Sequence, residues 1–168
     1  MTPVVEDLIE ANDVFARSFD AGALAAPPAR RLAVLVCMDA RIDPAKAIGL
    51  DLGDAHVIRN AGGRASDDAI RSLIISSRLL GTREFVVVHH TDCGMLTFSN
   101  DDLRAKLQEE SGADASGIDF LPFDDLEGSV RDDIDRIRSS PFVDPSIPVS
   151  GWIYDVKRGT IREVVPVN

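Results

Sequence analysis

The sequence is poor in cysteine, in basic residues and in long apolar runs. Only two cysteines, Cys37 and Cys93, occur among 168 residues. They are too few for a disulfide framework, so thiols in a reducing compartment are expected. No apolar run approaches the roughly 20 residues that cross a bilayer. With 18 basic against 28 acidic residues, the net charge is −10. Because such a charge repels nucleic acid and anionic lipid, neither is predicted as a partner.

The N-terminus also lacks the features of an export signal. Residues 1–13, MTPVVEDLIEAND, carry acids where a signal peptide carries bases, and they contain no continuous hydrophobic stretch. A cytoplasmic location is therefore the expectation. What the chain does contain, 45% hydrophobic and 27% charged residues, is typical of a globular protein, and the length predicts one domain over residues 1–168.

Apolar runs alternate with helical patterns along the chain. Runs rich in β-branched residues and leucine predict strands at 31–38, 55–61 and 84–90. Apolar spacing and capping residues predict helices at 4–19, 44–50, 67–81, 101–110 and around 130–137. The tail holds two short strand-like runs about a Lys-Arg-Gly turn, expected to form an edge strand and its return. The prediction is an α/β fold: a central, mostly parallel β-sheet with right-handed crossovers, flanking helices and an antiparallel edge strand.

Three helix starts have an expected N-cap. Asp43 precedes Pro44, and Asn100 precedes the fourth predicted helix. For the third helix, Ser66 or Asp67 fits.

Reactive side chains follow two of the predicted strands. Cys37, Asp39 and Arg41 stand at alternate positions after the first strand, and His90 and Cys93 follow the third. Because the carboxyl ends of parallel strands meet at one edge of a sheet, these groups are expected to converge. Thiolate and imidazole are ligands that zinc prefers. The pattern therefore favours a metal site.

Each residue also has a simpler interpretation. Cys37 could be a buried apolar side chain, and His90 a structural histidine. A disulfide between Cys37 and Cys93 would require export, against which the N-terminus argues. Asp39 and Arg41 could form a local ion pair and no more. The coincidence of all five at equivalent strand ends favours the metal.

The three histidines are assigned different roles. Neighbouring side chains on a strand point to opposite faces, so His89 and His90 cannot both face one site. His90 is selected because a turn beginning there can return Cys93 to the same metal. His56 and His89 are candidate proton carriers, but a structural role is the simpler interpretation of both.

Together the motifs resemble the beta-class carbonic anhydrases, most closely the compact prokaryotic branch. The resemblance rests on Cys-x-Asp-x-Arg at 37–41, VIRNAGG at 57–63, His-x-x-Cys at 90–93 and GWIYDVKRG at 151–159, and it covers most of the chain. It implies one zinc ion per subunit, bound by Cys37, His90 and Cys93. It also implies reversible hydration of carbon dioxide to bicarbonate and a proton by a zinc-bound hydroxide.

The same resemblance gives Asp39 two roles. Paired with Arg41, it leaves the fourth metal position open and can accept the hydrogen bond of the hydroxide; released from Arg41, it can become the fourth ligand. Gly62 and Gly63 either permit a tight turn or line the substrate cavity, and no Walker lysine follows them.

Family members assemble as dimers or larger oligomers, so a homodimer or homotetramer is expected. Residues 1–25, an N-terminal helix and a linker, are expected to pack on a neighbouring subunit and to be poorly buried in their own.

Two alternative functions remain. The same site could hydrolyse carbonyl sulfide or carbon disulfide, depending on an access tunnel shaped by regions such as 95–123. A non-catalytic zinc- or bicarbonate-binding protein, closed permanently by Asp39, would have no use for Arg41. A cysteine nucleophile is disfavoured because the segment from Cys37 to Arg41 is too short for a phosphatase loop and no Cys-x-x-Cys pair exists.

Overall fold

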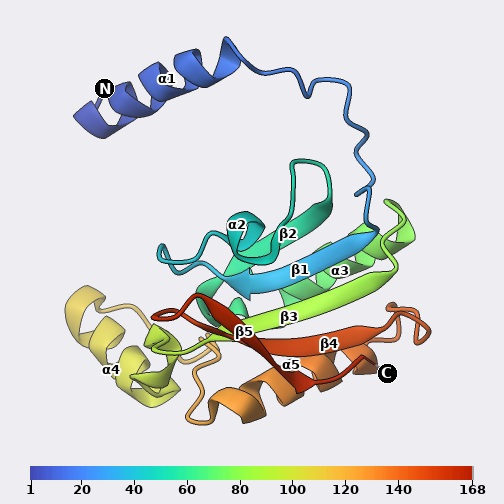
Figure 1. The fold of residues 1–168 in the computed structure, drawn as a ribbon. Helices are drawn as coiled ribbons and strands as arrows, with labels where there is room; N and C mark the ends of the chain where they lie inside the picture. Colours follow the sequence, from blue (N-terminus) through green and yellow to red (C-terminus); the bar gives the residue numbers. More distant parts are fainter. Residues whose placement is uncertain (168) are drawn as a thin grey trace.

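A five-stranded sheet in the order β2-β1-β3-β4-β5 forms the centre of the protein, as a computed structural model describing residues 1–167 shows (Figure 1). The strands are β1 (Leu32–Cys37), β2 (Ala55–Asn60), β3 (Glu84–His90), β4 (Val149–Asp155) and β5 (Thr160–Val165). The first four run parallel, and β5 pairs antiparallel with β4. The predicted fold class is confirmed, with one difference: of the two tail strands only β5 is an edge, because β4 pairs with both β3 and β5.

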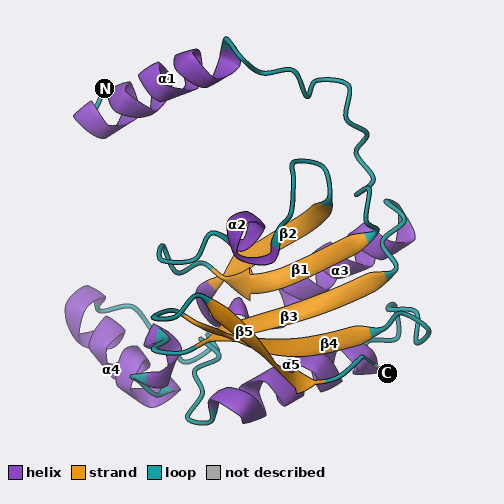
Figure 2. Ribbon diagram, viewed as in Figure 1, coloured by secondary structure: helices purple, strands orange, loops and turns teal. Residues whose placement is uncertain are grey.

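Helices lie on both faces of the sheet (Figure 2). They are α1 (Pro3–Ala16), α2 (Pro44–Ile48), α3 (Asp67–Arg78), α4 (Asn100–Ser111) and α5 (Leu126–Ser139), with short 3-10 turns η1 (Ala61–Gly63) and η2 (Gly94–Leu96). On one face, α3 and α5 pack on alternate residues such as Leu35 and Val87. On the other, α2 and its flanking loops pack on Val34 and Val88.

Two of the three expected caps are confirmed. Asp43 caps α2, and Ser66 caps α3. The prediction for α4 was wrong: Ser99, not Asn100, is its N-cap, because Ser99 and Asp102 satisfy each other's backbone N–H in a capping box. The amide of Asn100 instead donates to Asp119 Oδ1 at 2.8 Å.

Helix α1 stands apart from the sheet at the end of an extended linker (Figure 1). None of its residues is buried. Its apolar side chains are exposed, with Val4 at 67%, Leu8 at 64% and Phe15 at 57%. The expectation that this helix is poorly buried in its own subunit is confirmed.

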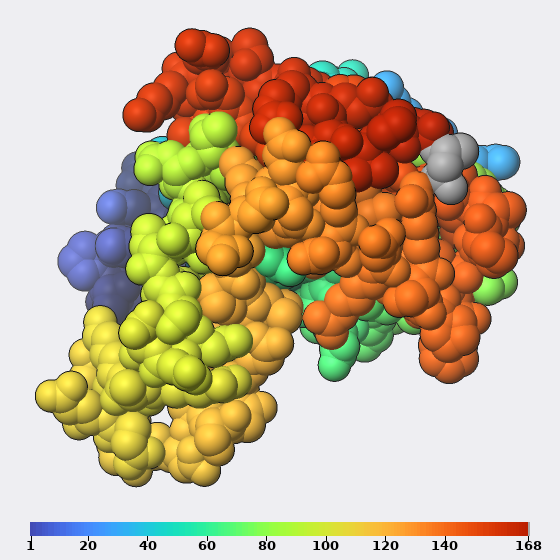
Figure 3. Space-filling model, turned by 90° about the horizontal axis from the view of Figure 1, so that it is seen from below, coloured from blue at the N-terminus to red at the C-terminus, as the bar shows by residue number. Residues whose placement is uncertain are grey.

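Seen from below, α5 and β5 lie side by side, while α4 and the loop after it project at one end (Figure 3). An ion pair of 2.8 Å between Glu127 of α5 and Arg162 of β5 joins the two elements. Among residues 1–167, no helix is both long and apolar enough to cross a membrane.

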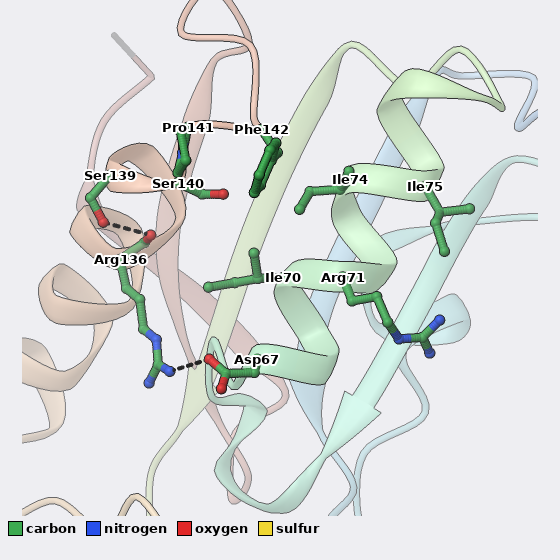
Figure 4. Close-up of a pocket in the computed structure, with 10 residues that line it drawn as sticks. All are labelled: Asp67, Ile70, Arg71, Ile74, Ile75, Arg136, Ser139, Ser140, Pro141 and Phe142. Carbon is green, nitrogen blue, oxygen red and sulfur yellow. Dashed lines mark hydrogen bonds and ion pairs between the residues drawn. The ribbon is translucent and has the colours of Figure 1, made fainter.

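A groove of about 440 Å³ lies between α3 and α5 (Figure 4). Ile70 and Ile74 line one side of it, and Phe142 faces them. An ion pair of 2.7 Å between Arg136 and Asp67 spans one end. Its lining holds neither cysteine nor histidine, so the candidate ligands lie elsewhere.

Candidate metal centre

Three buried side chains meet at the carboxyl edge of the sheet. Cys37 is the last residue of β1 and His90 the last of β3. The strands are parallel neighbours, with Val36 opposite Val88. The chain then turns through Asp92, whose positive φ of 58° returns Cys93 toward His90. The ligating atoms of Cys37, His90 and Cys93 all lie within 4.8 Å of one another.

The imidazole of His90 presents a free lone pair to this cluster. Its Nδ1 lies 2.9 Å from the carbonyl oxygen of Thr91, and because a carbonyl can only accept, Nδ1 carries the proton. Its Nε2 is buried and has no hydrogen-bond partner among residues 1–167. A buried nitrogen without a partner is costly, and a metal ion would satisfy it.

The two thiols behave as a coupled pair. The pKa of Cys37 lies well below its usual value because the Cys93 thiol donates to it, against the opposing effect of burial; the backbone of Asp39 and Gly62 also lowers it. The pKa of Cys93 is raised by that same hydrogen bond and by burial. A divalent cation in place of the shared proton would favour two thiolates. The donor set therefore fits zinc.

Arg41 lies between two carboxylates. Its Nη2 is 2.7 Å from Asp39 Oδ2, and its Nε is 3.0 Å from Asp39 Oδ1. Its Nη1 is 2.7 Å from Asp92 Oδ2, and its Nη2 also donates to the Asp92 carbonyl at 2.9 Å. The hydrogen bond from Arg41 holds the pKa of Asp39 far below its ordinary range, despite partial burial. Asp39 Oδ2 lies 3.8 Å from His90 Nε2. Asp39 is thus an ionised acceptor beside the ligand cluster.

Arg59 fixes the backbone that carries Cys37 and Asp39. Its Nε donates to the Cys37 carbonyl at 3.1 Å, and its Nη2 donates to the Asp39 carbonyl at 2.8 Å. Gly63 packs on the same strand, where an added Cβ would lie 2.8 Å from Cys37 N. These contacts fix the position of the segment that carries Cys37 and Asp39.

A cavity of about 390 Å³ opens beside the cluster. Its lining includes Cys37, Asp39, Gly62 and Cys93 together with the apolar residues Met38, Ala61, Met95 and Phe98. Gly63 lies behind this lining, against the backbone of β1. Substrate binding by the two glycines stays a prediction.

Sequence reasoning brought together Cys37, Asp39, Arg41, His90 and Cys93, and the structure does place these five in one site. It missed the second anchor of Arg41, Asp92, and the apolar wall of the cavity. The place of Asp92 between two suspected ligands was the available signal. For the wall no signal existed, because its residues come from separate loops.

The other histidines lie away from the cluster. His89 is fully buried on the opposite face of the sheet, with Nε2 2.9 Å from Asp133 Oδ2 and Nδ1 2.8 Å from Ser129 Oγ. His56 Nδ1 lies 2.7 Å from Ser76 Oγ. Both make the contacts of structural histidines.

The fold and the site together define a class of protein. A mostly parallel α/β sheet carries two cysteines and a histidine at the carboxyl edge of its parallel strands, beside a cavity and an ionised carboxylate. Three firm ligand groups with a cavity next to them are the pattern of catalytic zinc sites, whereas structural zinc sites are closed by four.

Comparisons with known proteins make the class specific. A family model described as carbonic anhydrase matches residues 32–161. The beta-carbonic anhydrase 1 of Mycobacterium tuberculosis is 44% identical over 165 residues, which cover 97% of this chain and 99% of that protein. A crystal structure of carbonic anhydrase from Streptococcus mutans has a TM-score of 0.93 at 47% identity and covers 98% of this chain and 99% of that chain. The chain belongs to the beta-carbonic anhydrase family, as its motifs predicted.

A second kind of relative shares the chain's sequence. A carbon disulfide hydrolase of Acidithiobacillus thiooxidans is 33% identical over 156 residues, which cover 81% of this chain and 78% of that protein. This similarity is relevant to whether the substrate is carbon dioxide or a sulfur analogue such as carbon disulfide.

Proposed function

We propose that the protein binds one zinc ion per subunit through Cys37, His90 and Cys93 and catalyses the reversible hydration of carbon dioxide to bicarbonate and a proton. The observation that carries the proposal is the convergence of three buried ligand atoms within 4.8 Å beside a cavity. Membership of the beta-carbonic anhydrase family supports it. When bound, zinc would lower the pKa of a water molecule to about 7 and so supply a nucleophile at neutral pH.

Asp39 orients the attacking water. Its carboxylate stays ionised because Arg41 stabilises the charge, and an ionised carboxylate can only accept hydrogen bonds. A water that donates to Asp39 Oδ2 has its lone pair directed elsewhere, toward the substrate carbon. Arg41 holds this carboxylate through its side chain, and an Asp39 released from Arg41 would be free to serve as a further zinc ligand and would then close the site.

The cavity suits a small uncharged substrate. Met38, Met95 and Phe98 give it an apolar wall, which favours carbon dioxide over water. Gly62 also lines the cavity and, having no side chain, leaves its space open. Gly63 lets the turn that carries Gly62 pack directly against the backbone of β1.

Hydrolysis of carbonyl sulfide or carbon disulfide is the second candidate function. Both molecules are linear, as carbon dioxide is, and can be attacked at carbon by the same nucleophile. The similarity to a carbon disulfide hydrolase supports this candidate. Turnover of each of the three substrates by the same zinc-loaded preparation decides between them.

We propose a homodimer or homotetramer in which α1 packs on a neighbouring subunit. The exposed apolar face of α1 supports this, because such a face in a monomer is a costly exposure. We propose a cytoplasmic location as well, supported by two free cysteines that must stay reduced to bind metal.

The test of the proposed function is carbon dioxide hydration by protein of known zinc content. The wild type is expected to hold one zinc and to be active, and His90→Gln is expected to lose both. His56→Gln is the matched control, because His56 lies outside the cluster, and it should keep both. A zinc-free wild type that is inactive after zinc addition would contradict the proposal.

A further inference from the structure

Arg64 and Phe123 form a backing behind the wall of the metal cavity. Met95 lines the cavity and is 7% exposed. The backbone N–H of Phe123 donates to the Met95 carbonyl at 3.2 Å. Gly62 lies close to both Met95 and Arg64: an added Cβ there would be 2.9 Å from Met95 Cγ and 3.1 Å from Arg64 Cγ. The side chains of Met95 and Arg64 thus both border Gly62, and Phe123 packs against the apolar cluster that contains Met95.

Two side chains that are distant in the sequence, those of Arg64 and His89, contact the Phe123 ring. The guanidinium carbon of Arg64 lies 5.2 Å from the ring centroid. The ring of His89 stacks on it, with centroids 5.6 Å apart and an interplanar angle of 20°. Contacts of both kinds favour one fixed ring orientation.

Asp133 of α5 anchors both of these groups. Its Oδ2 lies 3.0 Å from Arg64 Nε and 2.9 Å from His89 Nε2. Asp133 is 2% exposed, Arg64 is 8% exposed and His89 is fully buried. Because a buried carboxylate needs its partners, moving Arg64 would leave an uncompensated charge. Helix α5 therefore restrains the cavity wall from the far side of the sheet.

We infer that Arg64 and Phe123 are positioning residues that fix the width of the metal cavity and thereby select carbon dioxide over its larger sulfur analogues. Methionine is flexible and fills whatever space is available to it, so Met95 defines a narrow wall only where its surroundings are rigid. Sulfur is larger than oxygen, so a rigid wall beside the ligand cluster accommodates carbon dioxide more readily than its sulfur analogues. The inference rests on the proposed function and names what sets its specificity.

Two variants loosen the backing by independent routes. Phe123→Ala removes the ring and leaves the buried ion pair in place. The double variant Arg64→Met with Asp133→Asn removes both charges together, so no single buried charge is left unpaired, and the amide introduced on α5 can still bind His89. Phe142→Ala is the matched control, because Phe142 is 65% exposed and lines the separate groove of Figure 4.

The measurement is the ratio of kcat/KM for carbonyl sulfide to kcat/KM for carbon dioxide, on zinc-loaded protein with its zinc content and circular dichroism recorded. Both loosened variants are expected to raise this ratio by about tenfold, the size of effect that a small change in pocket fit produces. The control should match the wild type. A loss of structure alone would lower both values of kcat/KM without raising the ratio.

A second readout does not depend on turnover. The chain has three methionines, so ¹³C-methyl labelling gives few NMR signals. The Met95 methyl resonance of the zinc-loaded protein is expected to move and narrow in both loosened variants and to stay unchanged in the control. A ratio within about twofold of the wild type in both variants, with wild-type carbon dioxide hydration intact, overturns the inference. An inactive zinc-loaded wild type overturns the proposed function instead.

Discussion

The Nη2 of Arg41 lies 2.7 Å from Oδ2 of Asp39, and this contact directs a carboxylate toward the ligand cluster without releasing it. The arrangement gives Asp39 the position of a hydrogen-bond acceptor that orients the attacking water. If Asp39 acts in this way, Asp39→Ala should keep zinc and lose carbon dioxide hydration by about a hundredfold, the size of effect that misplacement of a reacting group produces. Stopped-flow hydration and metal analysis on one preparation test this. Asp68→Ala, an exposed acid paired with Arg71, is the control. Unchanged turnover in Asp39→Ala would remove Asp39 from the mechanism.

Asp92 holds the opposite side of the Arg41 guanidinium. Asp92→Asn keeps the carbonyl contact at 2.9 Å and removes the charge of the ion pair at 2.7 Å. Because both side chains are largely exposed, the effect should be modest, a severalfold loss of hydration at neutral pH. Arg41→Ala removes every side-chain contact with Asp39 and leaves only the hydrogen bond of 2.9 Å from the backbone N–H of residue 41 to Asp39 Oδ1. It should cost more, with Asp39 bound to zinc in its crystal structure. Full activity of Arg41→Ala at neutral pH would refute the switch.

The N-terminal helix should be needed for assembly. Deleting residues 1–25 removes an element with no buried residue in its own subunit, so the fold should survive while the oligomer dissociates. Light scattering after gel filtration measures the mass, and circular dichroism reports the fold. A truncated protein of unchanged oligomeric mass would contradict this arrangement.

Gly63 has a positive φ and also lies close to the backbone of β1. Gly81 has a positive φ without any close neighbour, so comparing the two glycines separates backbone strain from steric clash. Gly63 has φ 68°, and an added Cβ would lie 2.8 Å from Cys37 N and 2.9 Å from Val36 C. Gly81 has φ 77° and nothing within 4 Å. Gly81→Ala should therefore show backbone strain alone, about 1–3 kcal/mol of lost unfolding free energy. Gly63→Ala should lose more and should also bind zinc more weakly, since the clash displaces Cys37. Equal costs for the two variants in urea unfolding would show that the close approach is tolerated.

The Asp39–Arg41 pair should give the metal-free protein an acid-sensitive stability. The pKa of Asp39 is lowered in the folded state, chiefly by the hydrogen bond from Arg41. Such a group stabilises the fold above its unfolded pKa of about 4 and loses that contribution as the pH falls through the folded value. The difference in unfolding free energy between wild type and Asp39→Asn should therefore be constant from about pH 6 to 8 and shrink below about pH 4. A difference that grew toward acid pH would contradict the assignment.

Much of the fold was predictable because its signals are local. The strand run before Cys37 and the run ending at His90 are apolar and β-branched, and Ser66 and Asp43 cap their helices as their positions indicate. The cap of α4 was misplaced because two capping residues, Ser99 and Asn100, stand in sequence, and only a contact with Asp119 shows which of them is occupied elsewhere.

The metal site was predictable in its ligands and not in its surroundings. Two thiols and an imidazole after parallel strands can be recognised by type and spacing. The second anchor of Arg41 depends on the left-handed turn at Asp92, which a non-glycine residue rarely adopts. The contact of Phe123 with Met95 joins two loops that are separated in the chain by helix α4, and no local pattern encodes such a pairing.

By itself the sequence determined the chemistry that is available: which atoms can bind a metal, which carboxylate stands beside an arginine, and which segments become strands or helices. The tertiary structure alone decided that α5 supports the cavity wall through Asp133, that Arg59 fixes the segment carrying Cys37 and Asp39, and that no residue of α1 is buried in its own subunit. The physical reason is that propensity and periodicity act between near neighbours, whereas ion pairs and packing across the sheet form only when the sheet has brought distant residues together.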